Sequence, residues 1–250
     1  MYYYIFDIKK CKKRSQVEQI KDYLGELGIS GEFTYPTSAQ TAEELAELGL
    51  KKKYSTIVAV GGDDIINSVA NVMTGREEAM GAIPLLASDA LSSMLGVRNW
   101  REAAESLRFR KINQVHIGKT GNNKHFLTYV TLGMNMPVEV TIEFKDFYLQ
   151  SYVKNLIISN HHPEIKKLHD DHLDVALQGT PKLSIFDKFK SFVTSPSNGD
   201  KDISLLRARS LRVFTKTPAP ILLDDKIVCK TPQLLETSDE LLKIIVARKS

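Results

Sequence analysis

The residues with the clearest chemical meaning form one short stretch, STIVAVGGDDIINSVANVM, at positions 55–73. An apolar strand leads into Gly61 and Gly62, two carboxylates follow, and a helix begins. Glycines let a backbone approach a ligand closely, and a helix N-terminus offers free N–H groups to an anion. The stretch therefore predicts a phosphate-binding turn. A plain strand-to-helix turn, with Asp63 or Asp64 as the helix N-cap, fits the same residues.

A run of basic side chains lies ahead of this turn. The segment KKCKKR at positions 9–14 places five cations in six residues. Such a run can neutralise phosphate by charge, or bind an anionic membrane at about 1 kcal/mol for each cation near the surface. A solvated basic turn before a helix explains it equally well, so the three interpretations stay open.

The composition is that of an ordinary globular protein. Of the 250 residues, 42% are hydrophobic and 26% are charged, and the net charge is +4,. The two cysteines have no metal-ligand spacing and fit a reducing compartment,. We find no apolar run long enough for a transmembrane helix and no secretory signal. The sequence therefore predicts a cytoplasmic protein that can also sit peripherally on a membrane.

The first 111 residues alternate between two kinds of segment. Short apolar runs predict buried strands at 2–6, 55–60 and 82–86,. Ser15 and Glu18 form a capping-box pattern that predicts a helix start, and Thr41 and Glu44 repeat it,. Further helices are expected at 65–73, 89–95 and 101–107. Strands that alternate with helices predict an α/β fold, a doubly wound, mostly parallel sheet covered on both faces.

The pattern changes after Lys111. Short strand-like segments separated by turn residues predict a mostly antiparallel β domain, with strands at 114–118, 125–132, 138–144, 173–177, 211–215 and 221–223,. The polar stretch 178–204 predicts a loop, with an uncertain helix at 185–192. We therefore set the domains at 1–111 and 112–250, and the last strand is free to return to the first domain.

Four segments, taken together, resemble the diacylglycerol kinase and sphingosine kinase catalytic-domain family. The glycine turn is similar to the family signature GGDGT-x-N-E-V-x-N-G, and IPLLASDALSSMLG at 83–96 is similar to IPLGTGNDFARTLG. DDHLDVAL at 170–177 looks like DDGLLDV, and LLDDKIVCKTP at 222–232 looks like LDGE-x-x-x-x-x-P. NAD kinases share the glycine–aspartate turn but lack the match at 83–96, so we rank them lower.

This resemblance implies a nucleotide-binding domain followed by a β-sandwich with a lipid-binding surface, and a nucleotide bound between them. Family members transfer the γ-phosphoryl group of ATP to a lipid hydroxyl with Mg²⁺. Matched positions imply acid–base roles for Asp63 and Asp224 and a metal-linked carboxylate at Asp170. The implied cofactor-binding residues are Gly61, Gly62, Asp64, Asn67, Asp7, Lys9 and Ser88. We expect a lipid partner and no nucleic acid, and a homodimer stays open.

Several family motifs are altered in this chain. Residues 7–11 replace the N-P-x-S-G loop, and Asp64 replaces the last glycine of GGDG. Residues 86–90 replace G-T-x-N-D, and Lys226 replaces the glutamate of D-G-E. A carboxylate at about 4 Å from a phosphate costs about 1 kcal/mol in water and about 4 kcal/mol at an effective dielectric constant of 20. The sequence thus leaves two functions open, a lipid kinase of weak or lost activity and a pseudokinase that binds a lipid, a nucleotide or a protein.

Overall fold

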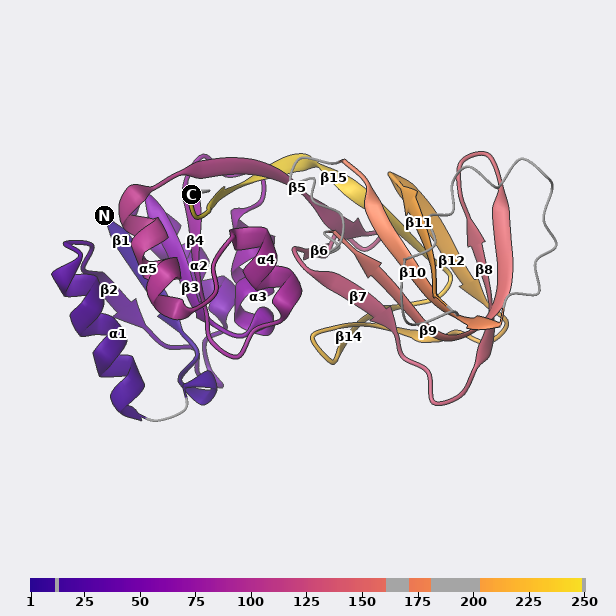
Figure 1. Ribbon diagram of the computed structural model, residues 1–250, viewed down its shortest axis with the longest axis horizontal. Coiled ribbons are helices and arrows are strands. Elements are labelled where there is room, and N and C mark those ends of the chain that lie inside the picture. The colour runs from indigo at the N-terminus through magenta and orange to yellow at the C-terminus, as the bar shows by residue number, and fades with distance from the viewer. Residues whose placement is uncertain (12–13, 161–170, 181–202, 249–250) are drawn as a thin grey trace. The chain divides into compact units, whose positions relative to one another are not determined.

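A computed structural model describes residues 1–11, 14–160, 171–180 and 203–248 (Figure 1). The described chain divides into two compact units. The first unit holds residues 1–116 and 239–248, and the second holds residues 117–160 and 171–238. The predicted loop at 178–204 was wrong at its two ends, because residues 178–180 belong to β10 (Leu173–Thr180) and residues 203–204 belong to β11 (Ile203–Ala208), which pair with each other. The rest of it, with the helix predicted at 185–192, lies outside the described residues.

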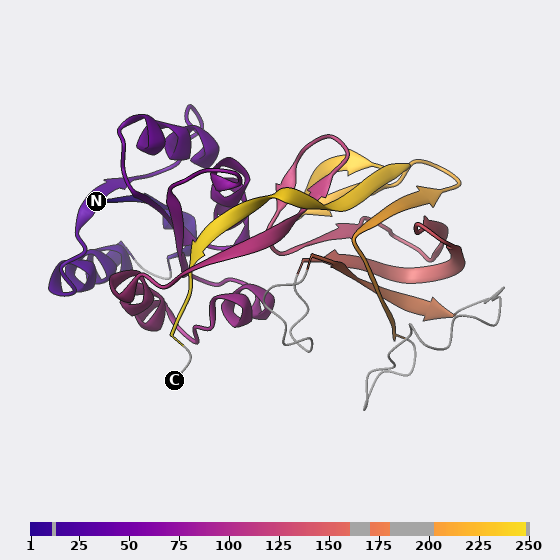
Figure 2. The ribbon, with the colours of Figure 1, turned by 90° about the horizontal axis from the view of Figure 1, so that it is seen from above.

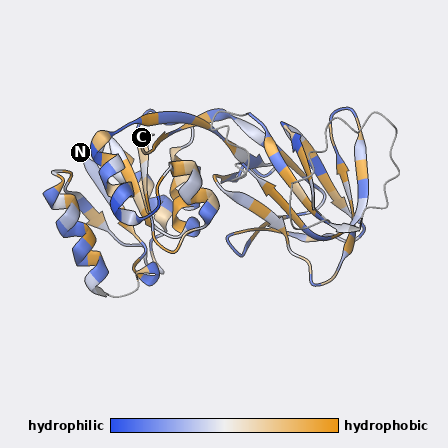
Figure 3. Ribbon diagram, in the orientation of Figure 1, coloured by the Kyte–Doolittle hydropathy of each residue, from blue (hydrophilic) through white to orange (hydrophobic). Residues whose placement is uncertain are grey.

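The first unit is built on a parallel sheet. Its strands are β1 (Tyr2–Phe6), β2 (Gly31–Thr34), β3 (Thr56–Gly61) and β4 (Ala79–Pro84). They lie in the order β4-β3-β1-β2. The central strands β1, β3 and β4 are almost wholly buried. Figure 3 colours the ribbon by hydropathy, and orange, hydrophobic segments occur in the sheet of this unit. Burial on both faces is what a parallel sheet requires, so the predicted α/β fold class is confirmed,.

Five α-helices connect and cover these strands. They are α1 (Arg14–Glu26), α2 (Ala42–Lys51), α3 (Asp63–Met73), α4 (Asp89–Leu95) and α5 (Trp100–Phe109). A 3₁₀ turn, η1 (Ile8–Lys10), follows β1. Among the described residues, no helix has both the length and the hydropathy needed to cross a bilayer,.

The two predicted capping boxes have different outcomes. Thr41 and Glu44 form the reciprocal pair of hydrogen bonds that starts α2, as predicted. The prediction at Ser15 was wrong, because α1 already includes Arg14 and Ser15 therefore lies inside the helix. Glu18 instead forms an ion pair with Lys21, one turn further on. A Ser-x-x-Glu pattern can therefore occur inside a helix, as here, as well as in a capping box at its start.

The second unit is a β-rich, antiparallel structure. It contains β6 (His125–Phe126), β7 (Tyr129–Leu132), β8 (Val138–Glu143), β9 (Tyr148–Ser159), β10 (Leu173–Thr180), β11 (Ile203–Ala208), β12 (Ser210–Thr215), β13 (Pro220–Leu223) and β14 (Lys226–Lys230). The core of this unit is made of alternate apolar residues from these strands, with Ile142, Val153 and Val175 fully buried. Period-two burial is the expected result when one face of a strand packs on a core.

Two long strands carry the chain between the units. The chain leaves the first unit along β5 (Ile112–Thr120) and returns along β15 (Gln233–Ile245). Figure 2 shows the two strands side by side, and they pair with each other. The end of β15 pairs in parallel with β4, at Ile244 and Met80, so the last strand adds to the first sheet.

Gly81 in β4 packs closely against α5, so adding one methyl group there should lower the stability of the protein. A Cβ added at Gly81 would lie 2.5 Å from Cδ2 of Leu107, so we expect Gly81→Ala to lower the free energy of unfolding by about 1–3 kcal/mol,. Gly25→Ala is the matched control. Its new Cβ would meet only Ser30 Oγ at 3.6 Å, and alanine favours the helix by up to about 1 kcal/mol,. Urea denaturation followed by Trp100 fluorescence measures both, and equal shifts would contradict the packing argument.

Candidate functional site

The glycine turn lies where the connections of the sheet diverge. From β1 the chain passes through α1 to β2 on one side, and from β3 it passes through α3 to β4 on the other. The carboxyl ends of β1 and β3 therefore form a topological switch point, which is where open α/β sheets place their ligands. Asp7 follows β1, and Gly61 and Gly62 end β3, so the fold brings these predicted residues together.

Gly61 allows the two strand ends to approach closely. A Cβ on Gly61 would lie 2.9 Å from Cβ of Asp7 and 2.7 Å from Cγ2 of Ile65, closer than real side chains come. The amide of Asp7 donates to the carbonyl oxygen of Val60 at 2.8 Å, which continues the pairing of the strands. Asp7 then accepts a hydrogen bond from the amide of Lys9 at 3.0 Å and caps η1.

Gly62 is the N-cap of α3 and has no side chain to cap the helix. The space that a Cβ would take there is already occupied, with Lys10 Cε at 3.0 Å and Asp64 Oδ1 at 3.2 Å from that point. Both glycines are buried. The N-terminus of α3 is therefore covered by the chain's own lysine and carboxylate. The contact of Lys10 with Gly62 could not be predicted from the sequence, because it depends on how the chain turns in η1.

Asp64 holds one carboxylate oxygen in an unusual environment. Among the described residues, Oδ1 of Asp64 is buried and has no hydrogen-bond partner. A buried polar atom without a partner costs free energy, although the positive end of the α3 dipole offsets part of that cost for a carboxylate. Asp64 thus supplies negative charge at the place where a helix N-terminus would otherwise receive an anion.

Asp63 joins the start of α3 to the start of α4. Its Oδ1 accepts a hydrogen bond from the amide of Ser88 at 2.8 Å, and the hydroxyl of Ser88 accepts one from the amide of Leu91 at 3.3 Å. The amide of Leu85 donates to the carbonyl oxygen of Gly61 at 2.7 Å. The segment from Leu85 to Ser88 is therefore fixed to the glycine turn, and Asp63 is already engaged in holding it.

Leu86 shows how the altered segment 86–90 behaves. Its φ of 53° is left-handed, and its side chain is 65% exposed. The left-handed conformation costs a residue with a Cβ about 1–2 kcal/mol, which glycine avoids. The family's glycine at this position is explained by that backbone, and this chain keeps the backbone with leucine instead.

Of the remaining predicted residues, Asn67 is buried in α3 and Lys9 is exposed on η1. Asp224 belongs to the second unit, where Asp224 and Asp225 connect β13 to β14 with φ values of 51° and 62°. Two left-handed residues in a two-residue connection are typical of a type I′ hairpin turn. Asp170, the predicted metal ligand, lies outside the described residues.

Two further observations concern metal binding and nucleophilic chemistry at the site. Across the described ranges, no three or more histidine, cysteine or acidic side chains gather in a way that could hold a metal ion. Burial, with a smaller contribution from the charge of Asp7, raises the pKa of the Cys11 thiol above its ordinary value. Cys11 therefore stays a thiol at neutral pH and is a poor nucleophile.

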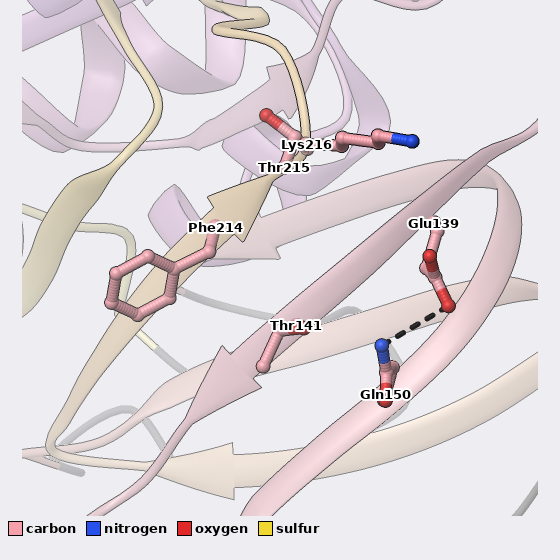
Figure 4. A pocket seen from close by; sticks show the side chains of 6 residues that line it. All are labelled: Glu139, Thr141, Gln150, Phe214, Thr215 and Lys216. Carbon is pink, nitrogen blue, oxygen red and sulfur yellow. Dashed lines mark hydrogen bonds between the residues drawn. The ribbon is translucent and has the colours of Figure 1, made fainter.

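A separate hollow of about 270 Å³ lies within the second unit (Figure 4). It is lined by Glu139, Thr141, Gln150, Phe214, Thr215 and Lys216. The amide of Gln150 donates to the Glu139 carboxylate at 3.0 Å, so the one acid there is paired. None of the predicted site residues lines this hollow, and we assign it no part in phosphate chemistry.

The fold and the turn define the class of protein, a doubly wound domain with a glycine turn at its switch point, joined to an antiparallel β unit. Residues 9–120 match the family model described as the diacylglycerol kinase catalytic domain. The chain is also similar to a crystal structure of a diacylglycerol kinase from Bacillus anthracis str. Sterne. The TM-score is 0.76 and the identity 18%, over 98% of this chain and 96% of that one.

Two further structures from the same strain agree, with TM-scores of 0.76 and 0.74 and identities of 17% and 16%. No curated protein matches the chain. At these identities the structures show the fold alone, and the family match covers residues 9–120, which is most of the first unit. The resemblance predicted from the altered motifs is confirmed. The roles predicted for individual site residues stay predictions.

The hydrogen bond between Asp63 and Ser88 can be tested directly. We expect Asp63→Ala to lower the free energy of unfolding by about 1–2 kcal/mol, because the partly buried amide of Ser88 loses its acceptor,. Asp63→Asn keeps an acceptor oxygen in place, so its free energy of unfolding should be close to that of the wild type. Urea denaturation gives the stabilities, and hydrogen exchange reports on the amide itself. If the Ser88 amide stayed protected in Asp63→Ala, the bond would have no structural role.

Proposed function

We propose that this protein keeps the diacylglycerol kinase fold without ATP-dependent phosphoryl transfer, and works as a binding protein of the pseudokinase type. The main observation in support is the close packing at Gly62. Lys10 Cε and Asp64 Oδ1 lie 3.0 Å and 3.2 Å from the point where a Cβ on Gly62 would be. The side chains of Lys10 and Asp64 thus lie at the N-terminus of α3, where a phosphate group would approach,. This favours weak binding of ATP with Mg²⁺.

Charge supports the same proposal. Three carboxylates surround the turn, those of Asp7, Asp63 and Asp64, and the nearest described cation is Lys10. Each carboxylate at about 4 Å from a phosphate opposes binding by about 1 kcal/mol in water, and by about 4 kcal/mol at an effective dielectric constant of 20. Lys10 offsets part of this repulsion, while Lys9, on the same 3₁₀ turn, is exposed to solvent. The turn is therefore a poor site for a triphosphate.

The second unit supports the proposal independently. Phosphoryl transfer to a hydroxyl needs an acid–base residue that accepts the hydroxyl proton, and the family resemblance implies an acid pair for this part of the chain. Here the matched segment is Asp224, Asp225 and Lys226. Lys226 supplies no carboxylate at the position where the family resemblance implies a glutamate. One carboxylate of the pair is retained, at Asp224, in a hairpin turn.

The competing function is an active ATP-dependent lipid kinase. It is favoured by the retained Gly61, Gly62, Asp63 and Asp224. The two functions differ in one early step, the binding of Mg-ATP, and in one late step, the transfer of label to a lipid hydroxyl. Both steps can be measured on the full chain.

We expect the wild-type chain to bind Mg-ATP too weakly for calorimetry and to transfer no label from ATP to a panel of lipid alcohols. The double variant Asp64→Gly, Leu86→Gly removes one carboxylate and one left-handed side chain, and should tighten Mg-ATP binding roughly fivefold or more. Asp146→Gly, which removes an exposed carboxylate from the second unit, is the matched control and should change nothing.

The result that overturns the proposal is transfer by the wild-type chain at a rate near that of an active diacylglycerol kinase assayed beside it. Tight binding of Mg-ATP by wild type, weakened in Gly62→Asp, would also contradict the closed turn. The folding of each variant is checked by circular dichroism before its binding is interpreted.

A further inference from the structure

A basic and apolar surface lies at the end of α5, in the first unit. It consists of five consecutive residues, Arg108 to Ile112, and of Arg248 near the end of the chain. We propose that this surface, the α5-end patch, binds the face of an anionic membrane. The patch is distinct from the proposed pseudokinase turn and does not depend on it.

The parts of the patch are held together by specific contacts. The guanidinium of Arg248 lies over the ring of Phe109, 5.0 Å from its centroid. The amide of Val246 donates to the carbonyl oxygen of Lys111 at 2.9 Å, and Arg110 donates to the carbonyl oxygen of Ser55 at 3.3 Å. The end of the chain is thereby fixed beside the start of β5, so the cations form one surface.

The patch carries positive charge without compensation. No aspartate or glutamate occurs between positions 106 and 138. In the part of the chain that the structure describes, Arg108, Arg110, Lys111 and Arg248 form no ion pair. Glu105, one turn away, accepts a hydrogen bond from the hydroxyl of Tyr23. An anionic partner is the chemistry that such a surface fits.

Two large apolar side chains decide which anionic partner is favoured. Phe109 is 51% exposed and Ile112 is 41% exposed, both between the cations. A membrane interface accepts apolar side chains below the headgroups and cations among them. A nucleic acid offers stacking to aromatic faces but nothing comparable to isoleucine, and Arg248 already lies over the Phe109 ring,. The membrane is therefore the favoured partner.

The patch and the glycine turn lie at opposite ends of the same strand. Ser55, which Arg110 contacts, directly precedes β3, and Gly61 ends it. Six strand residues span about 20 Å. Lys9 and Lys10, on η1, follow β1 at the end where the glycine turn lies. The α5-end patch is thus a second basic surface, and the two can be separated by mutation.

The test uses the full chain and sedimentation with vesicles of phosphatidylcholine, with or without phosphatidylglycerol. Each cation near an anionic surface raises partitioning roughly fivefold. Arg108→Gln, Arg110→Gln, Lys111→Gln together should therefore weaken binding to the anionic vesicles by about 10²-fold. Lys145→Gln, Lys154→Gln, Lys230→Gln removes the same charge from exposed positions of the second unit and should leave most binding intact.

A second measurement reports on the apolar side chains. In Phe109→Trp, the tryptophan emission above the Trp100 background should shift to the blue with anionic vesicles and stay unchanged with neutral ones. Equal losses in the two triple variants would overturn the proposal, because net charge alone would then explain binding. Patch-dependent binding to labelled DNA or RNA without vesicle binding would assign the surface to nucleic acid and overturn it as well. Neither outcome depends on whether Mg-ATP binds.

Discussion

The approach of the β1 and β3 ends at Gly61 is the constraint on which the first unit depends. Any side chain there would collide with Cβ of Asp7, so the strand ends can meet only across a glycine. That meeting sets where η1 turns, where α3 begins and which side chains reach the α3 N-terminus. The hydrogen bond from Ser88 to Asp63 then fixes the next connection to the same point. A small set of backbone contacts therefore organises every element of the candidate site.

The same geometry places carboxylates of the chain itself at the N-terminus of α3. A helix N-terminus that points into a turn needs negative charge and hydrogen-bond acceptors. In this chain Asp63 and Asp64 supply negative charge from the first turn of α3, and Lys10 packs against Gly62. No side chain caps the helix, and the hydrogen bond that Asp63 accepts comes from the amide of Ser88. The positive end of the helix is thus balanced in part by charge from within the protein.

Local patterns predicted much of the fold, and contacts between distant residues set the limit. The strand–glycine–helix pattern identified the turn, and the capping box at Thr41 identified α2, because both depend on neighbours within a few residues. The strand β9 was missed, although it pairs with its neighbour β8 as well as with β7 and β10. A last strand that could return to the first domain was allowed, but its bounds were not predicted, because β15 pairs with β4 and β12, which are distant or separated from it in sequence. The place of Lys10 depends on η1, and no spacing in the sequence shows it. The occupied space at Gly62 was likewise invisible to sequence analysis, although the glycine itself was identified.

The return of β15 to the first sheet has a consequence for synthesis on the ribosome. Residues from Asp239 onward complete the sheet by pairing beside β4, yet they are made after the whole second unit. While the nascent chain is elongating, one side of β4 therefore has an open row of backbone donors and acceptors. Exposed edges of that kind invite pairing with other chains. The first unit therefore cannot close that edge until translation has passed beyond the second unit.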